Sequence, residues 1–304
     1  MISKLIIIFL YQLIYALPVY YLHPFDPWNF PLCTCPEKYT VDPYTGCEHR
    51  CIYCYITSYI KDPWRVRPKK DFLKYFERDL KRTKIKLPIS MSNSSDPYPP
   101  MEKELRLTRG ALNLMRRYDF AVLLLTKSDI VTRDADILSS MRSVVSITLT
   151  TLDETLARKI EPFAPSPERR LQAIEYLKSK EIKVAVRFDP LIPFINDSPE
   201  EIRSVVKTLG DIGVDQIISS VYKAKRDNFF RVSCVFKERA EKLREIYYLN
   251  GHTVRGIRYA PESLRMKILT MVRNEAKKRG IPFSVCREGL NLNTAETCDA
   301  SHLL

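Results

Sequence analysis

The chain of 304 residues is poor in glycine, with 8 Gly against 20 Pro, which predicts a stiff backbone. It lacks a Lys/Arg block of the kind that forms a disordered basic tail, and it has no internal repeat or low-complexity segment. With 45% apolar and 28% charged residues, the composition favours neither a disordered chain nor a polytopic membrane protein. The length allows one large α/β domain or two smaller domains.

Positive charge is in excess. The 49 Lys and Arg outnumber the 36 Asp and Glu, which gives a formal net charge of +13. This balance is typical of a protein that binds an anionic partner such as nucleic acid. A generally Lys-rich surface is the alternative, because the excess is spread along the chain.

The eight cysteines are closely spaced in one place and scattered elsewhere. This distribution is not that of a small secreted disulfide scaffold. We therefore expect reduced thiols and a cytoplasmic location.

The first 22 residues complicate that expectation, because residues 5–22 are almost uniformly apolar. They could form a signal or anchor segment, or reflect a misassigned start codon. Their aromatic residues, Pro18 and a length below the roughly 20 residues that a bilayer requires argue against a membrane anchor.

Six short β-rich runs alternate with longer amphipathic stretches, the pattern of βα units around a parallel sheet. The predicted strands cover residues 39–43, 87–91, 120–126, 143–149, 182–188 and 215–221. Ser166-Pro167 and Ser198-Pro199 each place serine at the N-cap and proline at the first position of a helix. Because such crossovers are right-handed, the pattern predicts an α/β fold with a partial (β/α)6 TIM-like barrel.

Beyond Val221 the alternation weakens. Helical patterns at 236–248 and 261–279 and a strand-like run at 282–285 lead into an irregular tail, which predicts a C-terminal extension packed on the barrel. The expected parts are an apolar N-terminal segment (1–22), the core barrel (23–235), and a helical extension with a Cys-containing tail (236–304).

Three cysteines, Cys47, Cys51 and Cys54, follow the first predicted strand with the spacing C-x3-C-x2-C. Three thiolates in one loop can ligate three irons of a cubane cluster and leave the fourth iron open to substrate. A zinc site is the alternative, but it would need a fourth ligand such as His49 or a distant thiol. We expect His49 to be a solvated loop residue.

The motif C-x3-C-x-aromatic-C, with Tyr53 as the aromatic residue, resembles the signature of the radical SAM superfamily. The resemblance implies a 4Fe–4S cluster on the three cysteines, whose open iron chelates S-adenosylmethionine (SAM). One electron then cleaves SAM to methionine and a 5′-deoxyadenosyl radical, which abstracts hydrogen from a substrate.

Further motifs resemble the spore photoproduct lyase-related branch, described as DNA repair photolyase-like. These are Asn93-Ser94-Ser95-Asp96-Pro97-Tyr98, Leu125-Thr126-Lys127-Ser128, Ser146-Ile147-Thr148 and residues 161–170. The resemblance implies that Ser95 at the end of the second strand, Lys127 after the third and Ser146 on the fourth, together with Tyr53, contact the cofactor. A lysine at a strand's carboxyl end can pair with a carboxylate. The alternatives are a surface lysine and serines that cap strand ends.

Two other features concern the substrate. Arg187 and Asp189 interrupt an apolar run at the end of the fifth strand, where they would contact substrate or cofactor, or form an ion pair that closes the barrel end. Asn93 stands where the lyase has a hydrogen-donor cysteine. DNA repair through that thiol is therefore not implied, and the substrate is left open.

Four more cysteines lie near the chain ends: Cys33 and Cys35 before the main loop, and Cys286 and Cys298 in the tail. If they meet, they would form a second iron–sulfur cluster or a zinc site that fastens the tail. Alternatively they are unconnected, and some are buried as small apolar residues. Cys234 is expected to be a packing residue.

The sequence thus predicts a radical SAM enzyme that takes an electron from a ferredoxin- or flavodoxin-type donor and acts on an unidentified substrate, with nucleic acid as one hypothesis. Modification of a peptide, protein or small molecule is the first alternative. A non-catalytic metal-binding module is the second. A membrane partner is not expected.

Overall fold

The computed structural model describes residues 21–25 and 30–304. Apart from Tyr21 and Leu22, the apolar N-terminal segment lies outside these residues. The backbone amides of Tyr21 and Leu22 both donate to Asp79. Within the described ranges, no helix has the length and apolar character needed to cross a membrane.

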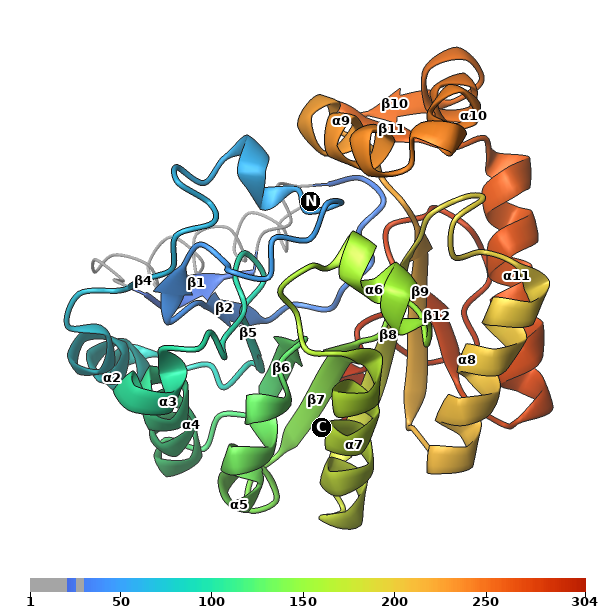
Figure 1. Ribbon diagram of the computed structural model, residues 1–304. Helices are drawn as coiled ribbons and strands as arrows, with labels where there is room; N and C mark the ends of the chain where they lie inside the picture. The colour runs from blue at the N-terminus through green and yellow to red at the C-terminus, as the bar shows by residue number, and fades with distance from the viewer. Residues whose placement is uncertain (1–20, 26–29) are drawn as a thin grey trace, which may run out of the picture.

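An eight-stranded sheet forms the centre of the molecule (Figure 1). In spatial order its strands are β1 (His23–Pro24), β2 (Tyr39–Val41), β5 (Ile89–Met91), β6 (Val122–Thr126), β7 (Ser143–Thr148), β8 (Lys183–Leu191), β9 (Gln216–Val221) and β12 (Phe283–Val285). All pairings are parallel except that of β1 with β2. The six predicted strands and the partial barrel are confirmed. The strand-like run near the C-terminus adds a further parallel strand, because it pairs with β9.

Helices connect the strands and cover the outside of the sheet (Figure 1). They are α2 (Phe72–Arg82), α3 (Glu102–Leu105), α4 (Leu107–Arg117), α5 (Ala135–Leu138), α6 (Glu154–Ile160), α7 (Pro167–Ser179), α8 (Pro199–Ile212) and α11 (Glu262–Lys278). Both predicted N-caps are confirmed, since the hydroxyls of Ser166 and Ser198 accept hydrogen bonds from Arg169 and Glu201 amides.

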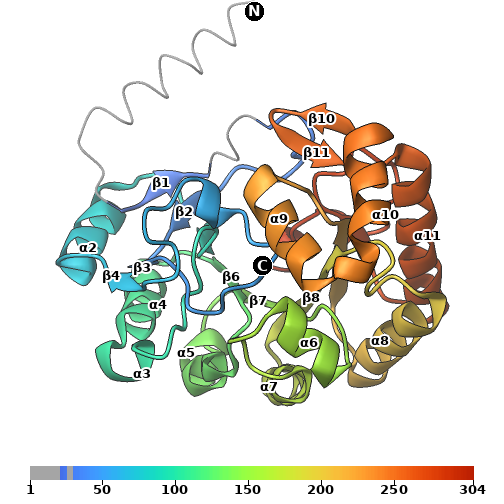
Figure 2. The same ribbon diagram turned by 45° about the horizontal axis from the view of Figure 1, so that its top comes forward.

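The two faces of the sheet bury different partners, because successive side chains on a strand point to opposite sides. Leu124 and Val145 belong to the main core beneath the helices. Val144 and Ala185 face the barrel interior, where they pack with Ala300 of the C-terminal tail. Figure 2 accordingly places the C-terminus near the centre of the molecule. The tail therefore fills part of the barrel interior.

The region after β9 differs from the prediction of one helix at 236–248. It contains α9 (Arg226–Val235), a 3-10 turn η3 (Lys237–Arg239), α10 (Ala240–Arg244), a π-helical turn η4 (Glu245–Leu249) and the hairpin β10 (His252–Val254) with β11 (Ile257–Tyr259). Helix α9 gave no sequence signal because only Asn228 and Val232 of its residues are buried. Because α9 has no apolar stripe, its sequence lacks the 3.6-residue hydrophobic period that identifies an amphipathic helix.

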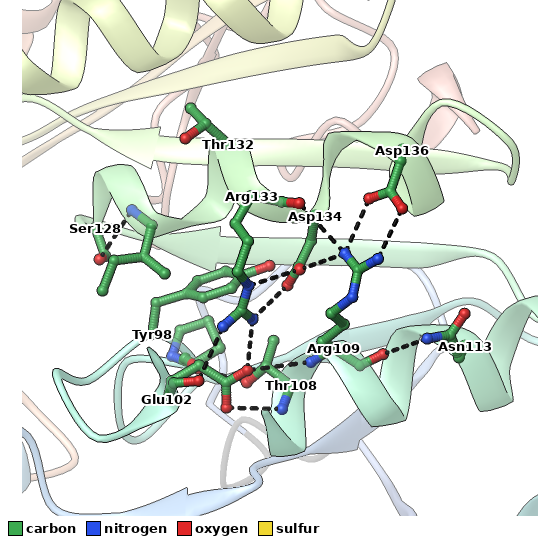
Figure 3. Close-up of polar contacts among 12 residues, drawn as sticks. Tyr98, Glu102, Thr108, Arg109, Asn113, Ser128, Thr132, Arg133, Asp134 and Asp136 are labelled. Carbon is green, nitrogen blue, oxygen red and sulfur yellow. Dashed lines mark hydrogen bonds and ion pairs between the residues drawn. The ribbon is translucent and has the colours of Figure 1, made fainter. Parts of the chain in front are cut away.

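A network of charged side chains fixes the loop that follows β5 (Figure 3). Glu102 accepts from the Thr108 amide and pairs with Arg133 at 2.7 Å. Arg133 also pairs with Asp134, which in turn pairs with Arg109 at 2.9 Å. These buried carboxylates have compensating partners, and the network holds α3, α4 and the turn η2 (Asp129–Asp134) next to the loop.

Candidate active site

The three motif cysteines lie in a loop between β3 (Tyr44–Thr45) and the 3-10 turn η1 (Ile56–Ser58). The loop starts at Gly46, whose φ of +83° and close approach to the Arg65 carbonyl leave no room for a Cβ. Its next amide, that of Cys47, donates to the Pro63 carbonyl at 2.8 Å. Glycine at this position therefore makes the turn that carries the cysteines over the strand ends.

Cys47, Cys51 and Cys54 line a cavity of about 390 Å³ together with side chains from the carboxyl ends of the strands. Burial raises the pKa of all three thiols, that of Cys51 to about 12. Nowhere in the described residues do three His, Cys, Asp or Glu side chains lie close enough to hold a single metal ion. A cubane cluster takes one thiolate per iron, so three thiolates in one loop can ligate three of its four irons, whereas a structural zinc ion would need a fourth ligand.

Asp96 joins the cysteine loop to two strand ends, a role that the sequence analysis missed. Its carboxylate accepts from the Thr126 hydroxyl at 2.8 Å and the Lys127 amide at 2.9 Å. It also lies 3.1 Å from Nε2 of His49. Burial opposes ionisation, but His49 and the backbone amides of Lys127 and Tyr98 hold the pKa of Asp96 at about 2. The prediction of a solvated His49 was wrong: it is 6% exposed.

Tyr53 and Lys127 approach one another beside the cluster cysteines. The Tyr53 hydroxyl donates to buried Glu161, which pairs with Arg170 at 2.6 Å. The Lys127 ammonium lies 5.6 Å from the centre of the Tyr53 ring. Among the described residues no carboxylate lies within 4.0 Å of that ammonium, whereas the Glu161 charge is already paired. Lys127 is thus positioned to bind an anionic group that enters the cavity.

The predicted serines differ in their hydrogen bonding. Ser95 donates toward Asp42 and the Tyr44 carbonyl at 3.3 and 3.2 Å. The Ser146 hydroxyl lines the cavity, is buried, and has no partner among the described residues. Ser92, which the sequence analysis missed, has the same properties. Two unsatisfied buried hydroxyls at the wall of one cavity fit a polar ligand such as SAM.

Charged residues also line the cavity. Arg187 pairs with Asp189 at 2.9 Å, as the ion-pair alternative predicted, and both line the cavity. Arg287 lies over the rings of Phe30 and Tyr55, at 5.5 and 5.9 Å. No carboxylate of the described chain pairs with its guanidinium. A substrate with a negative group would find its charge partner here.

Asn93 is tied to its neighbours. Its amide donates to the Thr40 hydroxyl at 2.7 Å and its oxygen accepts from Ser90 at 3.1 Å. It is therefore a structural residue of the cavity wall and carries no thiol hydrogen.

The remaining cysteines come together only in part. Cys35 and Cys298 are in contact, with 3.5 Å between their sulfur atoms. Cys33 and Cys286 line the same cavity as the motif cysteines. The prediction that Cys234 is a packing residue was wrong, because it is exposed on α9.

Residues 41–209 match the sequence model of the radical SAM superfamily. The match covers more than half of the chain, so the protein belongs to this superfamily and is a radical SAM enzyme. Membership implies a 4Fe–4S cluster and SAM as cofactors.

Curated relatives are themselves uncharacterised. A Methanocaldococcus jannaschii protein is 35% identical over 180 residues, which are 57% of this chain and 66% of that protein. An Acidianus two-tailed virus protein is 28% identical over 240 residues, 69% of this chain and 79% of its own length. A Mycobacterium tuberculosis protein is 24% identical over 193 residues, which are 59% of this chain and 56% of that protein.

Solved structures share the fold. A spore photoproduct lyase variant with bound AdoMet and dinucleoside spore photoproduct has a TM-score of 0.64 and 14% identity, over 84% of this chain and 78% of that chain. Streptococcus suis SuiB bound to its precursor peptide SuiA has a TM-score of 0.56 and 15% identity, over 81% and 48% of the two chains. At these identities the likeness concerns the fold.

Proposed function

We propose that this enzyme holds its 4Fe–4S cluster on Cys47, Cys51 and Cys54 and binds SAM against Lys127 and Ser146. The observation that carries the proposal lies in the cavity that the three thiols line: among the described residues, the Lys127 ammonium has no carboxylate partner and the buried Ser146 hydroxyl has no hydrogen-bond partner. When bound, the two cofactors supply reductive cleavage of SAM to methionine and a 5′-deoxyadenosyl radical.

The side chains then have distinct tasks. Lys127 pairs with the SAM carboxylate. The Ser146 hydroxyl forms a hydrogen bond with the ribose or the amino group of SAM, and Ser95 lines the same cavity. Tyr53 contacts the cofactor through its ring, because its hydroxyl is engaged by Glu161. The barrel and the tail exclude water and orient the substrate for hydrogen abstraction. The electron comes from a ferredoxin- or flavodoxin-type donor.

For the substrate we propose a nucleic acid, on the strength of a groove beside the cysteine loop. It is lined by Arg226, Phe230, Arg244, Tyr248 and Arg255. The three arginines and Phe230 are exposed. Exposed aromatics beside arginines are typical of single-strand nucleic-acid binding, through base stacking and phosphate contacts. The net charge of +13 supports the same class of partner.

The groove is connected to the cavity through η1, the turn that follows the cysteines. Lys225 donates to Ser58 at 2.9 Å, and Thr57 donates to Asp227. A strand bound in the groove would therefore lie beside the loop that carries the cluster.

A peptide substrate is the second candidate. The structure of SuiB holds a precursor peptide, and here Asn93 offers no thiol for hydrogen return. The Arg287 guanidinium, which has no carboxylate partner in the part of the chain that the structure describes, would suit an acidic side chain as well as a phosphate.

Cofactor loading tests the core of the proposal. The anaerobically reconstituted protein is treated with dithionite and SAM, and 5′-deoxyadenosine is measured by chromatography; this uncoupled cleavage needs no substrate. Cys51→Ala should lose both cluster and product, whereas Cys234→Ala, which removes an exposed thiol, should keep both. Cluster-loaded wild type that forms no 5′-deoxyadenosine would refute the proposal.

Salt-dependent binding tests the substrate. Fluorescence anisotropy with a labelled single-stranded oligonucleotide should give an affinity that falls with salt and falls by about tenfold or more in Arg226→Ala/Arg255→Ala. Arg203→Ala/Lys207→Ala removes the same charge from α8 and should change little. Absence of binding at low salt, or an equal loss in both variants, would exclude the groove and leave the peptide candidate.

A further inference from the structure

The sheet is an open barrel whose edge strands are β1 and β12. On its open side, residues 30–38 lie against the tail at 286–304. Leu32 packs against Gly289, and Lys38 pairs with Asp299 at 2.5 Å. We call this contact between the two chain ends the seam.

The tail has little regular structure to hold it in place. Its one helical element is the 3-10 turn η5 (Ser301–Leu303). Nevertheless Leu292, Cys298 and Ala300 are buried. A chain end of this kind is usually poorly ordered unless something ties it down, and a long irregular segment inside a compact domain needs a comparable explanation.

Thiols gather at the seam. The sulfur atoms of Cys35 and Cys298 are 3.5 Å apart across 263 residues of sequence, close to the roughly 3.8 Å between two thiolates on one tetrahedral metal with 2.3 Å bonds. Cys33 lies beside Cys35 and interacts with it electrostatically. Cys286, at the end of β12, lines the same cavity as Cys33 and Cys35.

Two buried cations, each also paired with a carboxylate, lie next to these thiols. Lys38 is 5% exposed, and its charge acts on Cys33 and Cys35. The charge of Arg187 acts on Cys286. Because a centre bound by several thiolates carries net negative charge, buried cations next to the sulfur atoms stabilise it.

We propose that Cys33, Cys35, Cys286 and Cys298 bind a second metal centre, a zinc ion or an iron–sulfur cluster, that fastens the tail across the open side of the barrel. Each thiol gives its proton to solvent as it binds, and the cysteine sulfur atoms keep their oxidation state. The Cys35–Cys298 pair is preformed. Cys33 and Cys286 complete the set by turning toward it, since no three ligands of the described chain yet surround one point.

A variant that lacks the first cluster isolates this centre. Cys47→Ala/Cys51→Ala/Cys54→Ala is purified anaerobically, loaded in separate arms with zinc or with iron and sulfide, and analysed for metal and sulfide. We expect one zinc, or two to four irons with sulfide, per chain. Adding Cys35→Ser and Cys298→Ser to this triple variant should abolish metal binding, whereas adding Cys234→Ser should leave the metal content unchanged.

A second measurement uses the protein with its first cluster intact. Cys35→Ser/Cys298→Ser should keep 5′-deoxyadenosine formation but lose several degrees of melting temperature and expose the tail to proteolysis. Wild type treated with a strong chelator should show the same cleavage of the tail. The proposal is overturned if the triple variant binds under 0.1 metal per chain in both arms, or if anaerobic wild type contains a Cys35–Cys298 disulfide. It is also overturned if Cys35→Ser/Cys298→Ser matches Cys234→Ser in metal content and melting temperature.

Discussion

The carboxylate of Asp96 lies 3.1 Å from the imidazole of His49 and ties the cysteine loop to the end of β6. This contact joins residues 47 positions apart and is shielded from solvent, with side chains 8% and 7% exposed. The loop that carries the motif cysteines is thus held at a strand end by one buried carboxylate that also accepts from Thr126 and Lys127.

Asp96→Asn should therefore loosen the cysteine loop. An amide removes the charge and replaces one acceptor with a donor, so we expect a loss of about 1–3 kcal/mol in the free energy of unfolding. Iron content after reconstitution should fall as well. Urea unfolding and iron analysis measure these effects. Asp136→Asn, which weakens a pair at an exposed carboxylate, should cost less than about 1 kcal/mol; equal losses would contradict the role of Asp96.

Ser146→Ala separates ligand binding from folding. Because the Ser146 hydroxyl has no partner within residues 21–25 and 30–304, its removal should leave the melting temperature unchanged or slightly raised, while SAM binding to the cluster-loaded protein weakens about threefold to tenfold. Ser219→Ala is the matched control on β9, since the Ser219 hydroxyl donates to the Phe188 carbonyl at 2.6 Å. It should lower stability and leave SAM affinity alone. Anaerobic equilibrium dialysis measures SAM affinity, and thermal melts measure stability. If Ser146→Ala and Ser219→Ala behave alike, the assignment of Ser146 as a SAM contact is disproved.

Lys127→Met should weaken SAM binding more strongly, by about tenfold to a hundredfold, because a charge-assisted contact is lost. No carboxylate of the described chain pairs with the ammonium, so folding should not suffer. Lys84→Met, at an exposed position, should change neither SAM affinity nor stability. If Lys127→Met retains wild-type SAM affinity in dialysis, Lys127 is not the carboxylate partner.

Asp189 predicts an acid dependence of stability. Burial opposes its ionisation, but Arg187 and Lys223 lower the pKa of Asp189 below its ordinary value. A carboxyl with a depressed folded-state pKa contributes stability above its unfolded pKa, near 3.9, and loses it as the pH falls toward the folded value. Wild type should therefore lose more stability between pH 5 and pH 3 than Asp189→Asn does. Urea unfolding at several pH values, with Asp211→Asn as the exposed control, tests this; parallel pH profiles would contradict it.

Local sequence patterns were sufficient for much of the fold. The strands were predictable from short β-rich runs, and α7 and α8 from Ser-Pro starts, because hydrophobic period and capping act between neighbouring residues. The hairpin β10–β11 and α9 lie where burial is sparse, so these elements left no period to detect.

The sequence alone determined that three thiols share one loop, that Lys127 follows a strand and that Ser146 lies on one, because spacing and strand position are local properties. Only the tertiary structure decided that His49 is buried against Asp96, that Ser95 is hydrogen-bonded while Ser146 is not, and that Cys35 contacts Cys298. These relationships depend on how the sheet curves and on which side chains then face the same cavity. Residues far apart in the chain become neighbours only when the barrel and its tail have packed.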